Sequence, residues 1–506
     1  MTGLPPAGTP PSPEPEPDAL GAARRRRLTT GLAVIVGACV IMAAAALALA
    51  VLRDDNGASD LTAPGPAPPP GDWDPRLEPI AAFVADARDL SWERPVAARF
   101  ETDEDFAAEL ADENGELSEE TEEQLGDTQR QMEALSLLPA GVDLLDVVEE
   151  TAATSVLAYY APESEEIVVR GLELDAARRA TLAHELTHAL QDQHFDLEQL
   201  QDDASERGNA GGVRSVVEGD AARIEREYVE SLPSDERAAY AEQSAQTGTD
   251  VAEALNAAEV PEVVKVSFGS AYAVGPPFVD VTIAVDGSGA VDDLFRPDIG
   301  EADVLTPLRF LEGVEQEVPG DVEVPDGAEQ VSDQDEFGAL SWYFTLAARL
   351  APATALEAVD GWNGDRAVSY EDGGVPCVAA RFVGRSAADT DRMVAALEAW
   401  AEPGPVDAAR VERQDGDAVL RACARGEVVG PERSLVDALA VATTRSTIFA
   451  ELIPAAPDEG AAWCLANAVV FDPELAPLLV APTLTAGEQA LLTERLQSGA
   501  ADCAPG

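Results

Sequence analysis

All three histidines of this 506-residue chain lie within residues 181–195. Two of them fit the pattern H-E-x-x-H, with His184 followed by Glu185 and, three residues later, by His188. On an α-helix, residues i and i+4 lie on one face, about 40° apart around the axis. Two imidazoles placed in this way can hold one Zn²⁺, and the glutamate beside them can handle a bound water. The pattern therefore predicts a metal-binding helix.

The residues around the motif predict how this helix is placed. Asp175 is a suitable N-cap, and leucines and alanines between 182 and 190 form one buried stripe, with the two histidines off its centre. Residues 156–160 and 166–169 are rich in Val, Ile and Tyr and predict two strands joined by a turn just before the helix. An extended substrate could pair with such an edge strand while its scissile bond lies over the metal.

A catalytic zinc site needs a third protein ligand. Glu218 is the preferred candidate, because it lies in the next predicted helix among small and apolar neighbours, where Gly219 permits close helix approach. His194 is the alternative, ten residues after His184 as in H-E-x-x-H-x-x-G-x-x-H. That longer motif has glycine where this chain has Gln191, so a continuing helix would turn His194 away from the metal.

Two carboxylates could orient the histidines from outside the ligand set. A histidine that binds a metal usually donates its other ring N–H to an oxygen. Asp220, close to Glu218, and Asp192, one turn beyond His188, are the candidates. The competing interpretation of Glu218 is an ordinary solvated glutamate, because Glu225 and two further glutamates lie on the same predicted helix.

These motifs resemble those of a known class of enzymes. His184-Glu-Leu-Thr-His188 followed by Glu218-Gly-Asp-Ala221 is similar to the gluzincin branch of the zincin metallopeptidases. More narrowly, the two segments resemble a poorly characterised bacterial family of envelope-anchored metalloproteases. Weaker similarities at 268–272 and 361–366 extend the resemblance over roughly residues 77–370.

The resemblance implies zinc-dependent hydrolysis of a peptide or protein substrate, with the two histidines and Glu218 as ligands. Glu185 would be the general base that takes a proton from a zinc-activated water. Tyr272 is the donor that the resemblance suggests for the tetrahedral oxyanion, and Tyr228 is a second candidate; either could instead be a core residue. The chain departs from the family at Ala271, where proline often precedes the tyrosine.

A membrane-anchored zinc peptidase is therefore the expected function. The alternative from another class is a catalytically inactive zincin fold that serves as an envelope binding or sensor module. The intact Glu185 argues against it, because an inactive copy has no need to keep its base. A zinc hydrolase that acts on something other than peptides is the third possibility.

The charge of the chain excludes one class of partner. Asp and Glu number 95 against 33 Lys and Arg, which gives a net charge of −62. Nucleic-acid binding depends on cationic side chains that neutralise phosphates, so no nucleic-acid partner is expected. The favoured interpretation of the acidic residues is a solvated surface, with a specific cationic partner as the alternative.

The N-terminal region predicts a membrane anchor. Residues 1–27 are Pro-rich, end in four arginines and predict a disordered cytoplasmic tail. Residues 28–52 carry no charge and are long enough to cross a bilayer core of about 30 Å, with the rest of the chain extracytoplasmic. A cleaved signal peptide ending near 48–50 is the alternative, although its apolar region is usually shorter. The Pro-rich residues 53–76 predict a semi-rigid linker.

The remaining chain predicts an α+β protein in two parts. A mainly helical zincin-like domain with a small sheet is expected over residues 77–350, and a small α+β domain over 351–506. Residues 279–285 alternate Val-Asp-Val-Thr-Ile-Ala-Val and predict a strand of the first domain. The second domain would position substrate or simply stabilise the protein.

The cysteines support an extracytoplasmic location. Cys39 falls within the predicted membrane segment, and the other four lie in the C-terminal third. Four cysteines allow three pairings, and an oxidising exterior favours bonding them. We expect the pairs Cys377–Cys423 and Cys464–Cys503. A second zinc site is not expected there, because the region has no Cys-x-x-Cys spacing and no histidine.

Overall fold

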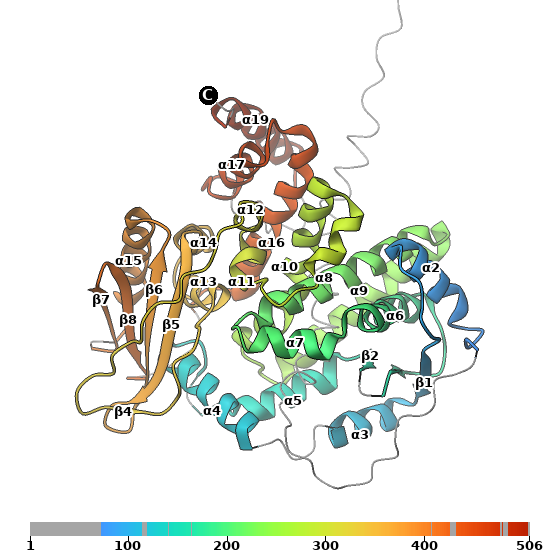
Figure 1. Cartoon of the computed structure of the whole chain (residues 1–506), viewed down its shortest axis with the longest axis horizontal. Coiled ribbons are helices and arrows are strands. Elements are labelled where there is room, and N and C mark those ends of the chain that lie inside the picture. Colours follow the sequence, from blue (N-terminus) through green and yellow to red (C-terminus); the bar gives the residue numbers. More distant parts are fainter. Residues whose placement is uncertain are drawn as a thin grey trace, which may run out of the picture.

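The computed structural model is a mainly helical α+β protein with one three-stranded and one five-stranded sheet (Figure 1). It describes residues 72–113, 119–139, 141–162, 164–405, 407–425, 432–475, 478 and 484–503. The predicted α+β class with mainly helical content and a small sheet is thus confirmed. The predicted tail at 1–27, the membrane helix at 28–52 and nearly all of the linker lie outside the described residues, and the domain division at residue 350 stays a prediction.

Helices dominate the described chain up to residue 360, with the three strands of the first sheet among them and β4, described below, between α12 and α13. In chain order these elements are α2 (Glu78–Arg88), β1 (Ala97–Glu101), α3 (Asp103–Glu113), α4 (Glu119–Ala134), α5 (Leu144–Ser155), β2 (Ala158–Ala161), β3 (Glu166–Arg170), α6 (Ala176–Phe195), α7 (Leu197–Ser205), α8 (Ala210–Ser231), α9 (Ser234–Ala257), α10 (Glu262–Asp286), η1 (Ser288–Leu294), α11 (Glu301–Leu305), α12 (Pro307–Leu311), α13 (Ala339–Ala347) and α14 (Pro352–Val359).

The three-stranded sheet has the strand order β1-β3-β2, so β2 is an edge strand beside α6. β1 runs parallel to β3, and β2 runs antiparallel to it, with Tyr160 opposite Ile167. The predicted strand–turn–strand unit before the histidine helix is therefore confirmed. One face of the sheet packs on α2 and α6 through Ile167 and Val169, in an apolar cluster with Leu182 and Leu186.

α8 and α10 cross where each carries a glycine. A Cβ added at Gly275 would lie 2.0 Å from the carbonyl oxygen of Ser215, and one added at Gly219 would lie 2.5 Å from the carbonyl carbon of Gly275. No side chain fits at either position, so the backbones of the two helices touch. The prediction that Gly219 permits close helix approach is confirmed, and the crossing fixes the turn of α8 that carries Glu218.

The predicted strand at 279–285 is wrong, because these residues are the last two turns of α10. The alternation of Val and polar residues satisfies a period of two, but β-branched residues also tolerate a helix that is packed on several sides. Val279 and Val281 are fully buried, against α8 and the C-terminal helix α16 (Leu435–Leu452). Among the described residues, α10 has the length and composition of a membrane-spanning helix, with 67% of its apolar window buried inside the protein.

The five-stranded sheet is antiparallel, has the order β4-β5-β6-β8-β7 and is covered by α15 (Figure 1). Ser386 caps α15, and Met393, Leu397 and Trp400 form its buried face. The elements are β4 (Glu329–Gln330), β5 (Trp362–Glu371), β6 (Pro376–Gly384), α15 (Ala387–Ala401), β7 (Ala409–Gln414) and β8 (Asp417–Cys423). These elements agree with the α+β character predicted for the chain after residue 350.

Segment 361–366 brings Asp365 under the N-terminus of α13. The Asp365 carboxylate accepts hydrogen bonds from the backbone N–H groups of Phe337 and Gly338 at 2.7 and 3.1 Å, and from the indole N–H groups of Trp342 and Trp362 at 2.8 and 2.7 Å. It thereby satisfies helix-terminal donors that would otherwise be unpaired.

Two glutamates lie close to this aspartate. Glu301 accepts from the N–H of Leu340 at 3.0 Å, in the first turn of α13. Glu336 precedes α13 and accepts from the side chain of Gln316. We call Glu301, Glu336 and Asp365 the carboxylate cluster.

The C-terminal helices α16, η2 (Ile453–Ala455), α17 (Glu459–Val470) and α19 (Ala486–Asp502) follow the five-stranded sheet. α16 lies along α10, and Figure 1 shows α17 and α19 beyond it at the top of the molecule. Disulfides join Cys377 to Cys423 across β6 and β8, and Cys464 to Cys503 between α17 and the residue after α19. Both predicted pairings are confirmed, and they indicate an oxidising, extracytoplasmic location.

Candidate metal centre

The histidine helix is α6. It begins after Asp175, whose side chain accepts from the N–H of Arg178 at 2.9 Å, as an N-cap does. The sequence between 176 and 195 contains no glycine or proline, so the helix continues for 20 residues without a break. His184 and His188 consequently share one face, with their ring centroids 4.6 Å apart.

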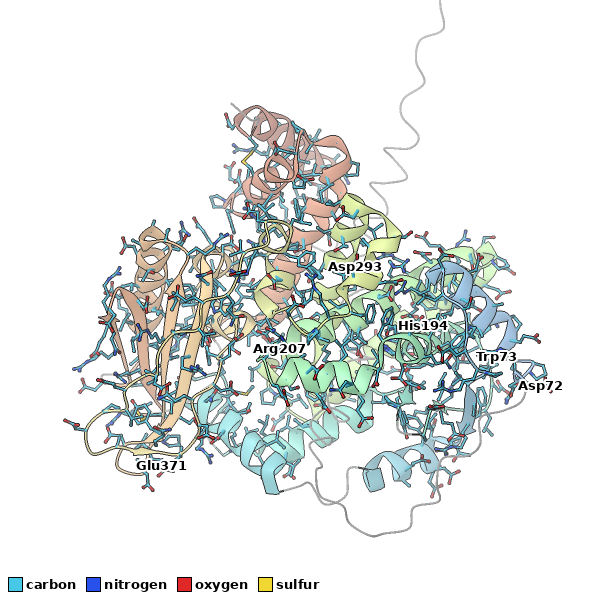
Figure 2. The ribbon with its side chains drawn as sticks, in the orientation of Figure 1. Asp72, Trp73, His194, Arg207, Asp293 and Glu371 are labelled. Atoms are coloured by element: carbon cyan, nitrogen blue, oxygen red, sulfur yellow. A yellow bond between two sulfur atoms is a disulfide. The ribbon has the colours of Figure 1, made fainter. Side chains whose placement is uncertain are left out.

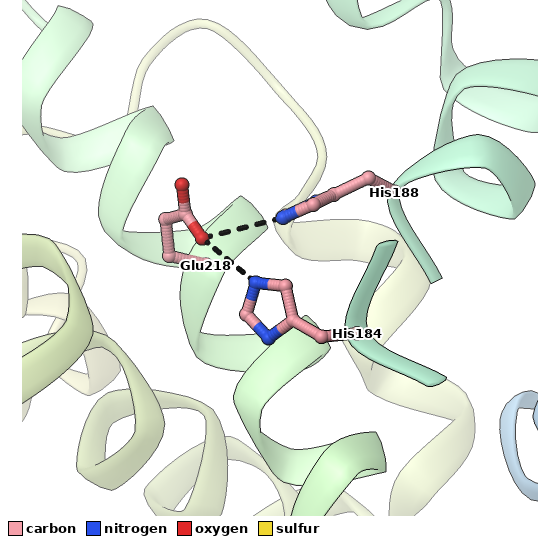
Figure 3. Close-up of side chains that lie close together, drawn as sticks. All are labelled: His184, His188 and Glu218. Atoms are coloured by element: carbon pink, nitrogen blue, oxygen red, sulfur yellow. Dashed lines mark hydrogen bonds and ion pairs between the residues drawn. The ribbon is translucent and has the colours of Figure 1, made fainter. Parts of the chain in front are cut away.

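α8 supplies the third group. The Nε2 atoms of His184 and His188 each lie 3.3 Å from the same oxygen of Glu218, Oε2 (Figure 3). One ligand atom from each residue can be chosen so that all three lie within 4.8 Å of one another. The side chains are 1%, 13% and 3% exposed, so three polar groups converge at a nearly dry point. Glu218 is thus a buried residue, which excludes the solvated interpretation.

The spacing of these atoms suits a divalent metal ion. Ligand atoms at about 2.1 Å from a tetrahedrally coordinated ion lie about 3.4 Å from one another. The two measured separations between nitrogen and oxygen, 3.3 Å each, agree with this value. Two imidazole nitrogens and one carboxylate oxygen also form a donor set that metal sites commonly use. The side chains of the three residues are therefore placed so that they could hold one ion.

Glu185 lies between the two histidines in sequence and beside the ligand set in space. It is 5% exposed, and one of its carboxylate oxygens accepts from the N–H of Tyr160 on β2 at 3.0 Å. Burial raises the pKa of Glu185 to about 7, although the nearby charges of His184 and His188 oppose the rise. A carboxyl group with such a pKa can both accept and release a proton near neutrality.

The ligand residues are strongly coupled. Burial opposes a charge on His184, but the carboxylates of Glu218 and Glu225 outweigh it and raise the pKa of the imidazole to about 10. Burial would likewise raise the pKa of Glu218, yet the charges and hydrogen bonds of the two histidines lower it. Without an ion, a protonated imidazole and the negatively charged Glu218 therefore lie together. A metal cation that binds here can take the place of the protons.

Tyr272 lies beside this centre. Its ring is stacked on that of His184, with centroids 6.1 Å apart and planes 19° from parallel. Burial and the negative charge of Glu218 raise the pKa of its hydroxyl well above the usual value. Tyr228, the other candidate, packs edge-on against Phe83 in a separate apolar cluster. Only Tyr272 of the two therefore neighbours the metal ligands.

The structure corrects the outer partners that were predicted for the histidines. Asp192 accepts from the hydroxyl of Tyr160 and from the N–H of Leu197, and Asp220 accepts from Gln191 and two arginines. Neither aspartate contacts an imidazole directly.

Two other residues take that place. The Nδ1 atom of His188 donates to Oε1 of Gln191 at 3.0 Å, and Nδ1 of His184 lies 3.5 Å from Oε2 of Glu225. Sequence reasoning missed both, although helical spacing could have found them. Gln191 follows His188 by one turn, and Glu225 follows Glu218 by two turns on the same face of α8.

His194 does not belong to the centre. It is an exposed residue in the last turn of α6, and its Nε2 donates to the carbonyl oxygen of Ser91 at 2.9 Å (Figure 2). The unbroken helix turns it away from His184, as the absence of glycine at position 191 predicts.

No family model, curated protein or solved structure matches this chain. The case for a metal centre therefore depends on the geometry of His184, His188 and Glu218.

Proposed function

We propose that this protein is a zinc-dependent metallopeptidase that acts outside the cytoplasm. The observation that carries the proposal is the convergence of His184, His188 and Glu218 with Glu185 directly beside them. Two histidines and one glutamate, with a carboxylate base between the histidines in sequence, form the set that thermolysin-type zinc peptidases use. Zinc is the proposed ion because it prefers this donor set with a fourth position open to water.

The chain's own groups can divide the chemistry of hydrolysis. A zinc ion in such a site lowers the pKa of its bound water and polarises the substrate carbonyl. Glu185 would accept one proton from water as the new C–O bond forms, and would deliver it to the amine nitrogen as the C–N bond breaks. The Tyr160 N–H holds the Glu185 carboxylate in place for this exchange.

Two neighbouring features support a peptide as the substrate. The N–H of Tyr160 points away from β3 towards Glu185, so this edge of β2 faces the metal centre. An extended chain that pairs with such an edge uses backbone hydrogen bonds, which are common to all peptides. The hydroxyl of Tyr272 is the proposed donor to the oxyanion, because its ring stacks on His184.

The location and anchor are part of the same proposal. The two disulfides support an oxidising compartment, and the uncharged residues 28–52 would span the membrane, with the N-terminus in the cytoplasm. The metal centre would then act on peptides or proteins outside the membrane.

The test compares wild type with Glu185→Gln. Peptides released from a mixed protein substrate by each purified full-length chain are identified by mass spectrometry, and zinc is measured in both. Loss of the general base should lower peptide release by about 100- to 10,000-fold while zinc content stays near one ion per chain. Glu198→Gln, at an exposed position on α7, is the matched control and should release peptides as wild type does.

Equal peptide release by wild type and Glu185→Gln contradicts the proposal. Stoichiometric zinc without peptide release by wild type supports instead an inactive zincin-like binding module.

A further inference from the structure

We propose that Gln191 and Asp220 are positioning residues for the metal centre, with Asp220 acting on His188 only through Gln191. The inference deepens the proposed function because it concerns the same metal site. It depends on metal binding by His188 but not on peptide hydrolysis.

The hydrogen bonds of Gln191 determine which way its amide points. Its Nε2 donates to the carbonyl oxygen of Val217 at 3.2 Å and to Oδ2 of Asp220 at 3.0 Å. A backbone carbonyl and a carboxylate can only accept from this amide, so a flipped orientation would place oxygen against oxygen. Oε1 of Gln191 therefore faces His188.

This orientation fixes the tautomer of His188. Because Oε1 is an acceptor, Nδ1 of His188 must carry the proton in the hydrogen bond of 3.0 Å. The lone pair of the neutral ring is then on Nε2, the atom that lies 3.3 Å from Oε2 of Glu218. The amide thus presents His188 in the form that a metal requires.

Asp220 holds the amide in turn. Its carboxylate is fully buried and accepts from Nε of Arg88 at 2.6 Å and from a terminal nitrogen of Arg223 at 2.9 Å, in addition to Gln191. Two guanidinium groups leave the carboxylate no freedom to rotate away from the amide. Arg88 comes from α2, so the first helix of the described chain completes the support of a ligand on α6.

The same arginines connect this buried group to the surface. Arg88 also pairs with Asp292 at 2.7 Å, and Arg223 with Glu227 at 2.7 Å; the two acidic side chains are 42% and 43% exposed. Asp220 is therefore not the only carboxylate that balances the charges of Arg88 and Arg223, because Asp292 and Glu227 also pair with these arginines. A role limited to neutralising the arginines would not require the contact with Gln191.

The first experiment measures zinc affinity of the full-length chain by competition with a chelator. Gln191→Leu keeps the size of the side chain but cannot orient His188, and should weaken zinc binding by about 10- to 100-fold. Gln193→Leu is the matched control. Gln193 lies on the same helix and bonds to the backbone of residues 93 and 94, away from the metal ligands. Gln193→Leu should therefore change the zinc affinity by less than about 2-fold, which is much less than the effect of removing a residue that orients a metal ligand.

A second measurement reports the tautomer without any metal. Because the chain has three histidines, ¹⁵N-labelled imidazoles can be assigned by NMR from single substitutions. At a pH high enough to keep the ring neutral, metal-free wild type should show the His188 proton on Nδ1, and Gln191→Leu should show a mixture of tautomers. A pure structural role for Gln191 would lower unfolding stability but would leave both the tautomer and the zinc affinity unchanged, and would overturn the inference.

A double-mutant cycle tests whether Asp220 acts through Gln191. Asp220→Asn should weaken zinc binding in the wild-type background, yet have little further effect in Gln191→Leu. Arg88→Lys, which keeps the charge but loses the Nε contact, serves the same cycle if Asp220→Asn does not fold. Additive losses would show that Asp220 acts independently and would overturn its assigned role. Absence of zinc binding by wild type would overturn this inference together with the proposed function, whereas zinc binding that is insensitive to Gln191 overturns the inference alone.

Discussion

Two regions of the molecule bury several carboxylates, and they do so in opposite ways. At the metal centre, Glu218 faces two imidazole nitrogens, and one potential ligand atom of each group lies near a common point. In the carboxylate cluster, Asp365 faces four N–H donors, two from the backbone and two from indoles. The first arrangement gathers atoms that can bind a cation in place of protons, and the second uses its carboxylate oxygens for hydrogen bonds.

The difference teaches how a functional carboxylate can be told from a structural one. Burial alone does not distinguish them, because it raises the pKa of Glu185 to about 7 and that of Glu301 to about 7 as well. The partners do distinguish them. Glu301 accepts from a helix-terminal N–H, whereas Glu185 adjoins two residues whose ring nitrogens converge on Glu218.

The largest expected difference is in metal binding. Glu218→Ala removes one of three ligands, and should weaken zinc binding by more than the roughly 100-fold that marks the loss of an outer-sphere partner. Asp365→Ala should leave one zinc per chain. Metal analysis of both dialysed proteins measures this difference. Equal zinc content in the two variants would contradict the assignment of metal binding to Glu218 and not to Asp365.

The reverse contrast concerns stability. Asp365→Ala leaves four N–H donors without their acceptor, and should lower the free energy of unfolding by about 3 kcal/mol or more. Ser332→Ala, before α13, is a control that removes two hydroxyl hydrogen bonds, one exposed and one half-buried, and no carboxylate. Urea titration measures both, and a loss below about 1 kcal/mol for Asp365→Ala would show that water replaces the carboxylate.

A third prediction concerns the crossing of α8 and α10, which the metal centre needs and the carboxylate cluster does not. Gly275→Ala forces a methyl group against the carbonyl of Ser215, and should destabilise the protein by about 2 kcal/mol. Gly269→Ala on the same helix meets only Leu439 at 3.9 Å, and should be neutral or stabilising by up to about 1 kcal/mol. Thermal unfolding compares the pair; equal effects would argue against backbone contact at the crossing.

The smallest expected effect is a change in pH dependence. Because burial raises the pKa of Glu301 from 4.5 to about 7, the folded state keeps its proton where the unfolded chain has lost it. This group therefore reduces stability as pH rises from about 4.5 through 7. Glu301→Gln should match wild type near pH 4.5 and become more stable by about 1–2 kcal/mol at pH 8.

Denaturant titrations at several pH values measure the effect of Glu301→Gln. The exposed Glu315→Gln should show no such change. A constant offset between Glu301→Gln and wild type at every pH would mean that Glu301 has the same pKa in the folded and unfolded protein, which would contradict the prediction.

Local patterns predicted most of what lies near the metal centre. The spacing of His184 and His188, the N-cap at Asp175 and the absence of glycine at position 191 were sufficient to predict α6 and to exclude His194. Glu218 could be chosen because Gly219 marked a helix contact, which the structure places at Gly275. Each of these inferences depends on fewer than about ten neighbouring residues within a regular helix.

Features that depend on distant contacts could not be predicted in the same way. Residues 279–285 have the alternation of a strand, and only burial between α8 and α16 makes them helical. Asp220 was expected to contact a histidine, but one intervening residue separates it from the imidazoles. Arg88, which holds Asp220 in this position, is 132 residues away in sequence. The four donors of Asp365 likewise come from the start of α13, with the two residues before it, and from β5, which the sequence does not show to be adjacent.

The two disulfides couple folding to the compartment in which it happens. They link residues 46 and 39 positions apart, and each such cross-link restricts the unfolded chain enough to contribute about 4 kcal/mol by loop entropy. Together they would supply an amount comparable to the whole net stability of a typical protein, about 5–15 kcal/mol. A chain in a reducing environment would lack this contribution, so the C-terminal part of the fold would reach its full stability only after oxidation.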